Sequence, residues 1–245
     1  MYDDNLMTTL IELKDVAKYY EMGESLVRAI DGISIHIEKG DFVAIMGPSG
    51  SGKSTAMNLV GSLDLATHGD IYLDGKNIEH LDESQLAQIR GKKIGFIFQS
   101  FNLIPNLTAK ENVMLPMLFQ DIPKEERESR AEELLALVDL SDRMDHYPNQ
   151  LSGGQQQRVA IARALANDPE VILADEPTGN LDTKTGELVL AFLERFNKNG
   201  KTVIMVTHDP RLAQDHAKTI YWLKDGRIEK VTRRINNSWK EQRLP

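Results

Sequence analysis

The segment Gly47-Pro48-Ser49-Gly50-Ser51-Gly52-Lys53-Ser54 matches the pattern G-x-x-x-x-G-K-S/T. It directly follows the apolar run Phe42–Met46 and precedes the stretch Thr55–Val60, which is expected to be helical. In a strand, loop and helix of this kind, the glycines let backbone N–H groups point at phosphate oxygens, and the helix N-terminus adds partial positive charge. Lys53 is expected to contact the outer phosphates, and the Ser54 hydroxyl to ligate Mg²⁺. The alternative, a plain glycine-rich turn, needs neither Lys53 nor Ser54.

Further short apolar runs indicate a sheet that is covered on both faces. Val171–Ala174 and Val203–Val206, like Phe42–Met46, are continuous and bounded by glycine or polar residues, as is typical of buried parallel strands. The segment 33–37 instead alternates isoleucine with polar residues, which predicts a strand with one buried face. The core is therefore expected to be α/β.

Two hairpins and a helical insertion complete the expected organisation. Asp74-Gly75 and Asp225-Gly226 each separate two apolar stretches, 72–73 from 76–78 and 220–223 from 228–231, and predict tight turns. Lys124–Leu140 places apolar residues at helical spacing, with charged residues between them. Residues 101–158 are expected to be a helical insertion within one domain, since the chain shows neither an internal repeat nor a Pro/Ser-rich linker.

Composition excludes several classes of protein. The 245 residues are 41% hydrophobic and 27% charged, which is typical of globular proteins. Because there is no cysteine, disulfides, thiolate metal sites and cysteine nucleophiles are excluded. The formal charge of −8 argues against nucleic acid as a partner. No apolar run approaches the length of about 20 residues that spans a bilayer, and the acidic start Met1–Asn5 predicts a cytoplasmic protein.

The end of the chain is basic, unlike the rest. Segment 230–245 contains five lysines and arginines against one glutamate, Glu241. It is interpreted as a solvated tail, with contact to acidic lipid or to a partner as the alternative.

Val171–Ala174 runs into the acidic pair Asp175-Glu176. Ligands of α/β proteins bind where parallel strands end, so these carboxylates are expected near the phosphates. Asp175 is expected to hold the Mg²⁺ shell, and Glu176 to polarise an attacking water. An N-cap in a solvated loop is the alternative for Asp175.

A further segment, Leu151-Ser152-Gly153-Gly154-Gln155, lies between the two motifs and precedes an amphipathic helix expected over Gln155–Leu165. With these motifs in this order, the chain resembles an ABC transporter ATPase subunit from about residue 10 to residue 231. The resemblance implies a P-loop NTPase (RecA-like) core formed by 1–100 and 159–231, with an antiparallel β subdomain, the helical signature subdomain 101–158 and the basic tail 232–245. Tyr20 resembles the aromatic residue that stacks on adenine, with Tyr19 as the alternative.

The same resemblance implies the functional residues. Gln99 matches the glutamine at the Mg²⁺ and water site, Asn180-Leu181-Asp182 matches a loop that passes between two subunits, and His208 matches the histidine that contacts the γ-phosphate. The implied catalytic residues are Glu176, His208, Lys53 and Gln99, and the implied Mg²⁺ ligands are Ser54, Gln99 and Asp175. The implied nucleotide-contacting residues are Tyr20, Gly47, Pro48, Ser49, Gly50, Ser51, Gly52, Lys53, Ser54, Thr55, Gln99, Ser152, Gly153, Gly154, Gln155, Asp175, Asp182 and His208.

The resemblance also implies an activity and partners. ATP would be hydrolysed by a homodimer in which Ser152 and Gly154 of one subunit cover the ATP held by Gly47–Thr55 of the other, at the inner face of the cell membrane beside a transmembrane permease. The segments 20–24, 98–105 and 149–166 resemble the macrolide-exporter and lipoprotein-releasing group, which favours export or mechanotransmission. An ATP-driven signalling module without transport is the alternative. A GTPase is excluded, because Asn197-Lys-Asn-Gly200 lacks the aspartate that would read guanine.

Overall fold

The computed structural model describes residues 9–23 and 25–242 of the chain. Residues up to Leu86 together with those from Asn197 onward form one compact unit, and Ala87–Phe196 form a second one. The acidic start at residues 1–5 and the tail residue Arg243 lie outside the described residues.

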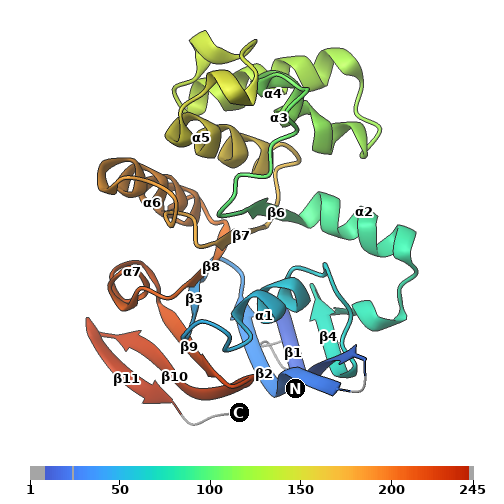
Figure 1. Cartoon of the computed structure of the whole chain (residues 1–245), viewed down its shortest axis with the longest axis vertical. Coiled ribbons are helices and arrows are strands. Elements are labelled where there is room, and N and C mark those ends of the chain that lie inside the picture. Colours follow the sequence, from blue (N-terminus) through green and yellow to red (C-terminus); the bar gives the residue numbers. More distant parts are fainter. Residues whose placement is uncertain (1–8, 24, 243–245) are drawn as a thin grey trace, which may run out of the picture. The chain divides into compact units, whose positions relative to one another are not determined.

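A four-stranded antiparallel sheet of order β2-β1-β4-β5 lies in the first unit (Figure 1). Its strands are β1 (Thr9–Met22), β2 (Ser25–Glu38), β4 (His68–Leu73) and β5 (Lys76–Asn77). Ile33, Ile35 and Ile37 of β2 are buried, which confirms the predicted alternation. Asp74 and Gly75 form the turn of the β4–β5 hairpin with positive φ, as the Asp-Gly signal predicts.

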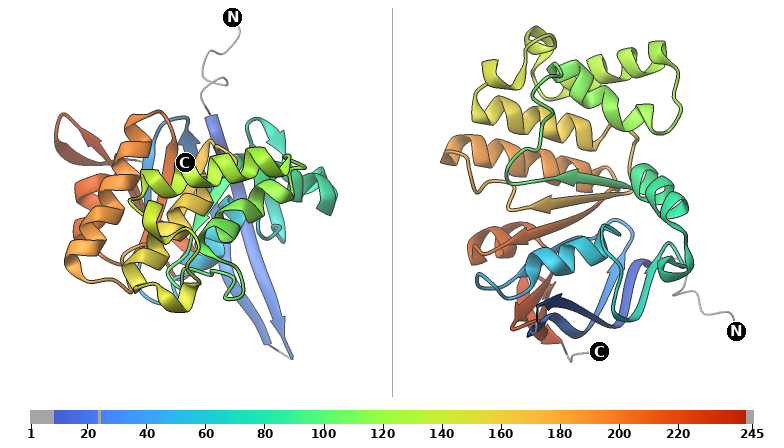
Figure 2. Two further views of the ribbon diagram at one scale, coloured as in Figure 1. Left: turned by 90° about the horizontal axis from the view of Figure 1, so that it is seen from above. Right: turned by 45° about the vertical axis from the view of Figure 1, so that its right-hand side comes forward.

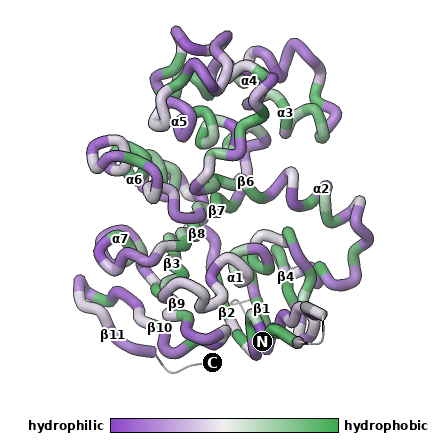
Figure 3. The backbone as a smooth tube through the Cα atoms, viewed as in Figure 1, coloured by the Kyte–Doolittle hydropathy of each residue, from purple (hydrophilic) through white to green (hydrophobic). Residues whose placement is uncertain are grey.

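Five further strands of this unit have the order β11-β10-β9-β3-β8. Their bounds are β3 (Phe42–Met46), β8 (Thr202–Thr207), β9 (Thr219–Lys224), β10 (Arg227–Ile235) and β11 (Ser238–Gln242). β3 pairs in parallel with both β8 and β9, whereas β9, β10 and β11 form antiparallel hairpins. β3 and β8 are buried throughout, and Figure 3 shows the apolar colour of β3. Helices α1 (Lys53–Val60) and α7 (Pro210–His216) pack against these strands.

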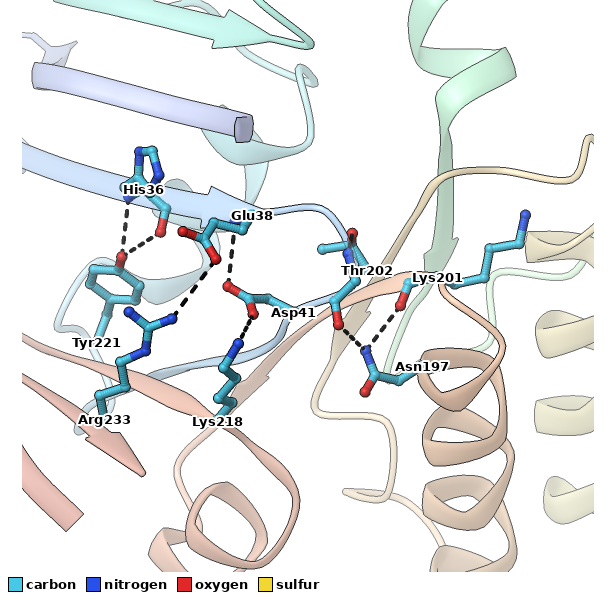
Figure 4. A network of polar contacts seen from close by, with 10 residues as sticks. His36, Glu38, Asp41, Asn197, Lys201, Thr202, Lys218, Tyr221 and Arg233 are labelled. Atoms are coloured by element: carbon cyan, nitrogen blue, oxygen red, sulfur yellow. Dashed lines mark hydrogen bonds and ion pairs between the residues drawn. The ribbon is translucent and has the colours of Figure 1, made fainter. Parts of the chain in front are cut away.

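Polar contacts join the sheets of this unit at the end of β2 (Figure 4). The carboxylate of the buried Asp41 forms an ion pair with the Lys218 ammonium, at 2.9 Å between oxygen and nitrogen. The Tyr221 hydroxyl, on β9, donates to the His36 carbonyl at 2.7 Å and accepts from the His36 N–H at 3.1 Å. Because these partners lie far apart in the sequence, the contacts fix how β9 lies against β2.

The second unit contains a parallel strand pair and a helical layer. β6 (Ile94–Ile97) pairs with β7 (Val171–Asp175). The helices are α3 (Ala109–Leu118), α4 (Lys124–Leu137), α5 (Gly153–Ala164) and α6 (Thr183–Lys198), and α2 (Glu83–Lys93) leads into β6. Helices α3, α4 and α5 contact one another (Figure 2) around buried side chains that include Val113, Leu135 and Val159.

The expected helices are therefore confirmed, with small differences at their ends. The helix predicted over Lys124–Leu140 ends at Leu137, and the one predicted over Gln155–Leu165 begins at Gly153. The helical layer extends to Ala164, beyond the boundary predicted at residue 158. In the part of the chain that the structure describes, none of the helices has the length and apolar character that crossing a bilayer requires.

The C-terminal segment is largely exposed, as the main interpretation of a solvated tail expects, but it forms regular strands. Residues 232–235 continue β10, and 238–242 form β11, which pairs with β10 from Val231 to Ile235. Trp222 of β9 donates its indole N–H to the Thr232 hydroxyl at 3.0 Å. The main-chain N–H of Arg234 donates to the Lys218 carbonyl at 2.8 Å. Sheet hydrogen bonds order this basic segment, and its net charge alone does not predict them.

We expect truncation after Val231 to destabilise the protein more than truncation after Ile235. The shorter chain loses the pairing of 232–233 with β9 and the hydrogen bonds of Thr232 and Arg234, at about 1 kcal/mol per bond. The expected fall in melting temperature is about 4–8 °C. Thermal unfolding of the two truncated chains beside the full chain measures this difference. Equal melting temperatures for both truncated chains would show that β10 contributes nothing beyond Val231.

Candidate active site

The phosphate-binding loop lies between β3 and α1, and two of its glycines have no room for a side chain. A Cβ on Gly47 would overlap the Leu223 carbonyl oxygen of β9, and one on Gly52 would overlap the Ala29 carbonyl oxygen of β2. Gly52 also has a φ of 99°, which side chains rarely allow. The loop backbone is therefore packed directly against the backbones of two strands.

Within this loop, Lys53 and Ser51 are buried and Ser54 is exposed. The Lys53 ammonium donates to the Pro48 carbonyl at 2.8 Å, so the side chain curls over the loop. The Ser51 hydroxyl has no hydrogen-bond partner among the described residues, although its main-chain carbonyl accepts from the Gly226 N–H at 3.0 Å. Since buried polar groups are normally paired, the Ser51 hydroxyl indicates a cradle for a polar ligand.

The two tyrosines of β1 have different surroundings. The Tyr20 hydroxyl donates to Asp64 at 2.9 Å. Burial, followed by Asp64, raises the pKa of Tyr20, while the nearby Thr55 side chain lowers it. The Tyr19 hydroxyl donates to Asp31 at 2.8 Å. Because Thr55 belongs to the first turn of α1, Tyr20 is the tyrosine that lies beside the phosphate-binding loop.

His208 follows β8 and is exposed. In the parallel pair of β3 and β8, Met46 lies opposite Thr207. The residues that follow the two strands, Gly47 and His208, therefore leave the sheet at the same edge.

The second unit repeats this arrangement with β6 and β7. Ile97 lies opposite Ala174 in the register, so Gln99 and the pair Asp175-Glu176 leave at one edge. Asp175, Glu176 and Gln99 are all half-buried. Glu176 has a φ of 42°, in the left-handed region that costs a non-glycine residue roughly 1–2 kcal/mol. Strained backbone of this kind gathers at functional sites, and here it turns the chain sharply after Asp175.

The segment Ser152–Gln155 starts helix α5. The Ser152 hydroxyl accepts from the Gln155 N–H at 3.3 Å, and the Gln155 side chain accepts from the Ser152 N–H at 2.8 Å, which together form a capping box. Ser152 and Gly153 are exposed, so the positive end of α5 is accessible. A Cβ on Gly154 would lie 2.6 Å from the Thr185 methyl carbon, which explains the glycine.

Asp182 caps the neighbouring helix α6. Its carboxylate accepts from the Thr185 hydroxyl at 2.6 Å and from the Thr185 N–H at 3.1 Å. These hydrogen bonds, that from the hydroxyl first, lower the pKa of Asp182. Through Thr185, Asp182 is thus linked to Gly154 at the start of α5.

The predicted residues accordingly form two clusters, each inside one unit. The phosphate-binding loop, Tyr20 and His208 belong to the first unit, and Gln99, the signature segment, Asp175, Glu176 and Asp182 to the second. Sequence reasoning missed the supports of these clusters, namely Asp64, Gly226 and Arg163. No motif marks Asp64 or Arg163, and the Asp-Gly signal marks Gly226 only as part of a turn, because each residue acts through a contact between distant parts of the chain.

We expect Gly47→Ala to disrupt the phosphate-binding loop far more than Gly50→Ala. The first variant forces a methyl group into the Leu223 carbonyl, an overpacking that costs about 3 kcal/mol, and it weakens nucleotide binding. Gly50 has a positive φ of 76° with nothing within 4 Å of an added Cβ, so its replacement costs only about 1–2 kcal/mol of backbone strain. Thermal unfolding and nucleotide titration of both variants measure the difference. Equal losses would contradict the packing argument.

Comparison with known proteins agrees with these motifs. Residues 30–179 match the family model described as ABC transporter. An uncharacterized ABC transporter ATP-binding protein of Thermotoga maritima is 54% identical, over 93% of this chain and 97% of that protein. The macrolide export ATP-binding/permease protein MacB of Shigella flexneri is 50% identical over 91% of this chain, which spans only 34% of that longer protein.

A solved structure is also similar. It is the dimeric, post-hydrolysis state of an ATP-binding cassette of Methanocaldococcus jannaschii bound to ADP and Pi, with 51% identity, a TM-score of 0.85, and coverage of 91% of this chain and 98% of that one. The fold is thus that of a P-loop NTPase with an antiparallel β subdomain and an inserted helical subdomain. On its motifs, its fold and these similarities, the chain belongs to the ABC transporter family as an ATP-binding subunit, and it is a transport ATPase.

Proposed function

We propose that the chain is the ATP-hydrolysing subunit of an export or mechanotransmission system, which dimerises on ATP and drives a conformational change in a transmembrane partner. The observation that carries this proposal is the pair of accessible helix N-termini, one after the phosphate-binding loop and one at Ser152. Each is an anion-binding terminus, so one chain offers two phosphate-binding surfaces.

The residues Gly47–Thr55 would hold the phosphates. The backbone N–H groups of the loop and of the start of α1 would donate hydrogen bonds to the phosphate oxygens. The Lys53 ammonium would leave the Pro48 carbonyl and contact the outer phosphates instead. Tyr20 would stack on the adenine, a role that its place beside Thr55 supports over Tyr19. His208 would contact the γ-phosphate from the same sheet edge as the loop.

Mg²⁺ fits the donor set of Ser54, Gln99 and Asp175, because a hydroxyl, an amide and a carboxylate supply the oxygen ligands that this ion prefers. When bound, the ion neutralises charge on the outer phosphates. The chain's own contribution to the chemistry is at Glu176. Its carboxylate would orient the attacking water and accept a proton from it as the water oxygen attacks the γ-phosphorus and ADP leaves.

A homodimer would complete the site. Ser152, Gly153, Gly154 and Gln155 of one subunit would cover the γ-phosphate held by the other, and Asp182 would lie in the loop between the subunits. The dimeric state of the similar Methanocaldococcus jannaschii cassette supports this assembly. Two-fold symmetry then places two ATP molecules in one interface.

The partner would be a transmembrane permease, with the ATPase bound to it at the cytoplasmic face of the membrane and without nucleic acid. The similarity to the MacB export proteins, which join ATP-binding and permease parts in one chain, supports this arrangement. An ATP-driven signalling module without transport is the second candidate. Co-purification of the partner, followed by an accumulation assay with it, separates export from signalling.

We expect Glu176→Gln to separate binding from hydrolysis. The amide keeps the shape of the side chain but cannot accept a proton, so the hydrolysis rate should fall roughly 10²–10⁴-fold while ATP still binds. Uncleaved ATP should then hold the dimer together. Gel filtration with ATP, with ADP and without nucleotide, beside an ATPase assay, measures both effects.

Lys53→Ala is the matched control, because it should lose phosphate binding and dimerisation together. If Glu176→Gln stays monomeric with ATP bound, the shared-nucleotide dimer is refuted. If it hydrolyses ATP at the normal rate, the catalytic role moves elsewhere, first to His208.

An apolar surface on the helical layer is the proposed contact for a short helix of the partner. The surface is expected from segment 101–107 with Met114, Met117, Leu118 and Phe119, because adaptable methionine and aliphatic side chains suit such a contact. The structure divides this set. Leu118 is 49% and Phe119 72% exposed, whereas Met117 is 1% exposed and belongs to the core.

We therefore expect Leu118→Gln with Phe119→Gln to leave the ATPase rate of the isolated subunit unchanged and to abolish its stimulation by the partner. Met117→Gln is the contrasting variant, since it buries a polar group and should lower the melting temperature. ATPase assays with and without the membrane partner measure the coupling. Full stimulation of the doubly substituted chain would show that this surface is not the contact.

A further inference from the structure

The main chain of Gln99 is tied to the loop between β7 and α6. The Asn180 side chain donates from Nδ2 to the Gln99 carbonyl at 3.0 Å. Asn180 is exposed, and both residues belong to the same compact unit. A hydrogen bond between two loops of this kind fixes the position of the Gln99 peptide relative to the residues that follow Glu176.

The side chain of Gln99 lies against the residue before Asn180. A Cβ on Gly179 would be 2.8 Å from Gln99 Nε2 and 3.3 Å from its amide carbon. Gly179 does not have a positive φ, so a side chain at this position would meet no backbone strain and would instead displace the amide end of Gln99. The dipeptide Gly179-Asn180 therefore contacts both ends of Gln99, its carbonyl and its amide.

A second tether holds the chain just beyond Gln99. Arg163 of α5 donates to the Phe101 carbonyl at 2.7 Å and also to the Asn102 carbonyl. Phe101 and Asn102 have φ values of 61° and 50°, a left-handed pair that needs outside support. Burial lowers the pKa of Arg163, because removing the guanidinium from water disfavours its charge. The hydrogen bonds to the two carbonyls offset this desolvation cost. With one end of this segment fixed by α5, the position of Gln99 depends on its contacts with Gly179 and Asn180.

We propose that Asn180, with the space left by Gly179, is a positioning residue for Gln99. This proposal rests on the proposed role of Gln99 at the Mg²⁺ and water site. Asn180 acts through the Gln99 peptide and sets where the amide oxygen of Gln99 meets the ion.

The test is a double-mutant cycle that follows the ATPase rate of the full chain as the Mg²⁺ concentration varies. Asn180→Ala removes one hydrogen bond, so we expect kcat to fall about three- to tenfold, with a rise of similar size in the half-saturating Mg²⁺ concentration. Asn180→Asp should behave in the same way, because a carboxylate has the same size but cannot donate. The melting temperature should fall by no more than about 2–4 °C, the effect of a single hydrogen bond. Asn199→Ala, at an exposed asparagine in the turn after α6, is the matched control.

The cycle pairs Asn180→Ala with Gln99→Ala. If Asn180 acts through Gln99, the doubly substituted chain is no worse than Gln99→Ala alone. Additive losses, or normal Mg²⁺ dependence of Asn180→Ala beside a defective Gln99→Ala, would overturn the positioning role and leave the role of Gln99 intact. Normal Mg²⁺ dependence of Gln99→Ala would instead overturn the proposed function of Gln99, and the inference with it.

Discussion

The phosphate-binding loop is held by backbone against backbone, and the rest of the first unit depends on this contact. Gly47 lies against the Leu223 carbonyl of β9, and Gly52 against the Ala29 carbonyl of β2. On the remaining side the N–H of Gly226 donates to the Ser51 carbonyl. The loop therefore takes its shape from two strands that are distant in the sequence. A correct loop requires both β2 and β9 to be in place, so the site depends on the fold of the whole unit.

Helix α5 has a comparable part in the second unit. Its first turn is capped by Ser152, its interior residue Gln157 donates to the Pro177 carbonyl at 2.9 Å, and its last turn carries Arg163. One rigid element thus supports the signature segment, the loop after Glu176 and the segment after Gln99. A helix transmits displacement along its axis better than a loop does, because its hydrogen bonds are internal. Packing against α3 and α4 keeps this element in place.

Local patterns predicted the elements and proposed most residues of the candidate site, because each such signal acts within a few residues. The apolar runs of β3, β7 and β8, the Asp-Gly turns and the phosphate-binding motif all belong to this class. The supports of the site could not be predicted in the same way. In the sequence, Arg163 is indistinguishable from the other polar residues of an amphipathic helix. Its carbonyl partners come into reach only when residues 101 and 102 adopt left-handed φ values. The strands of the basic segment after Val231 could not be predicted for the same reason, since they depend on pairing with β9 and between β10 and β11 and not on charge.

Both clusters of candidate functional residues follow from one property of parallel strands. Neighbouring parallel strands end at the same edge of a sheet. The residues that come directly after them therefore lie close together, and no additional sequence signal is needed for this. Met46 lies opposite Thr207 in one unit and Ile97 opposite Ala174 in the other. The four segments that begin there carry Gly47, His208, Gln99 and Asp175. Sheet register therefore sets the first approach of the chemical groups. The finer placement then requires specific side-chain contacts with main-chain carbonyls, such as that of Asn180 with Gln99. A motif can identify the groups, and only the packed chain can set their positions to within a hydrogen-bond length.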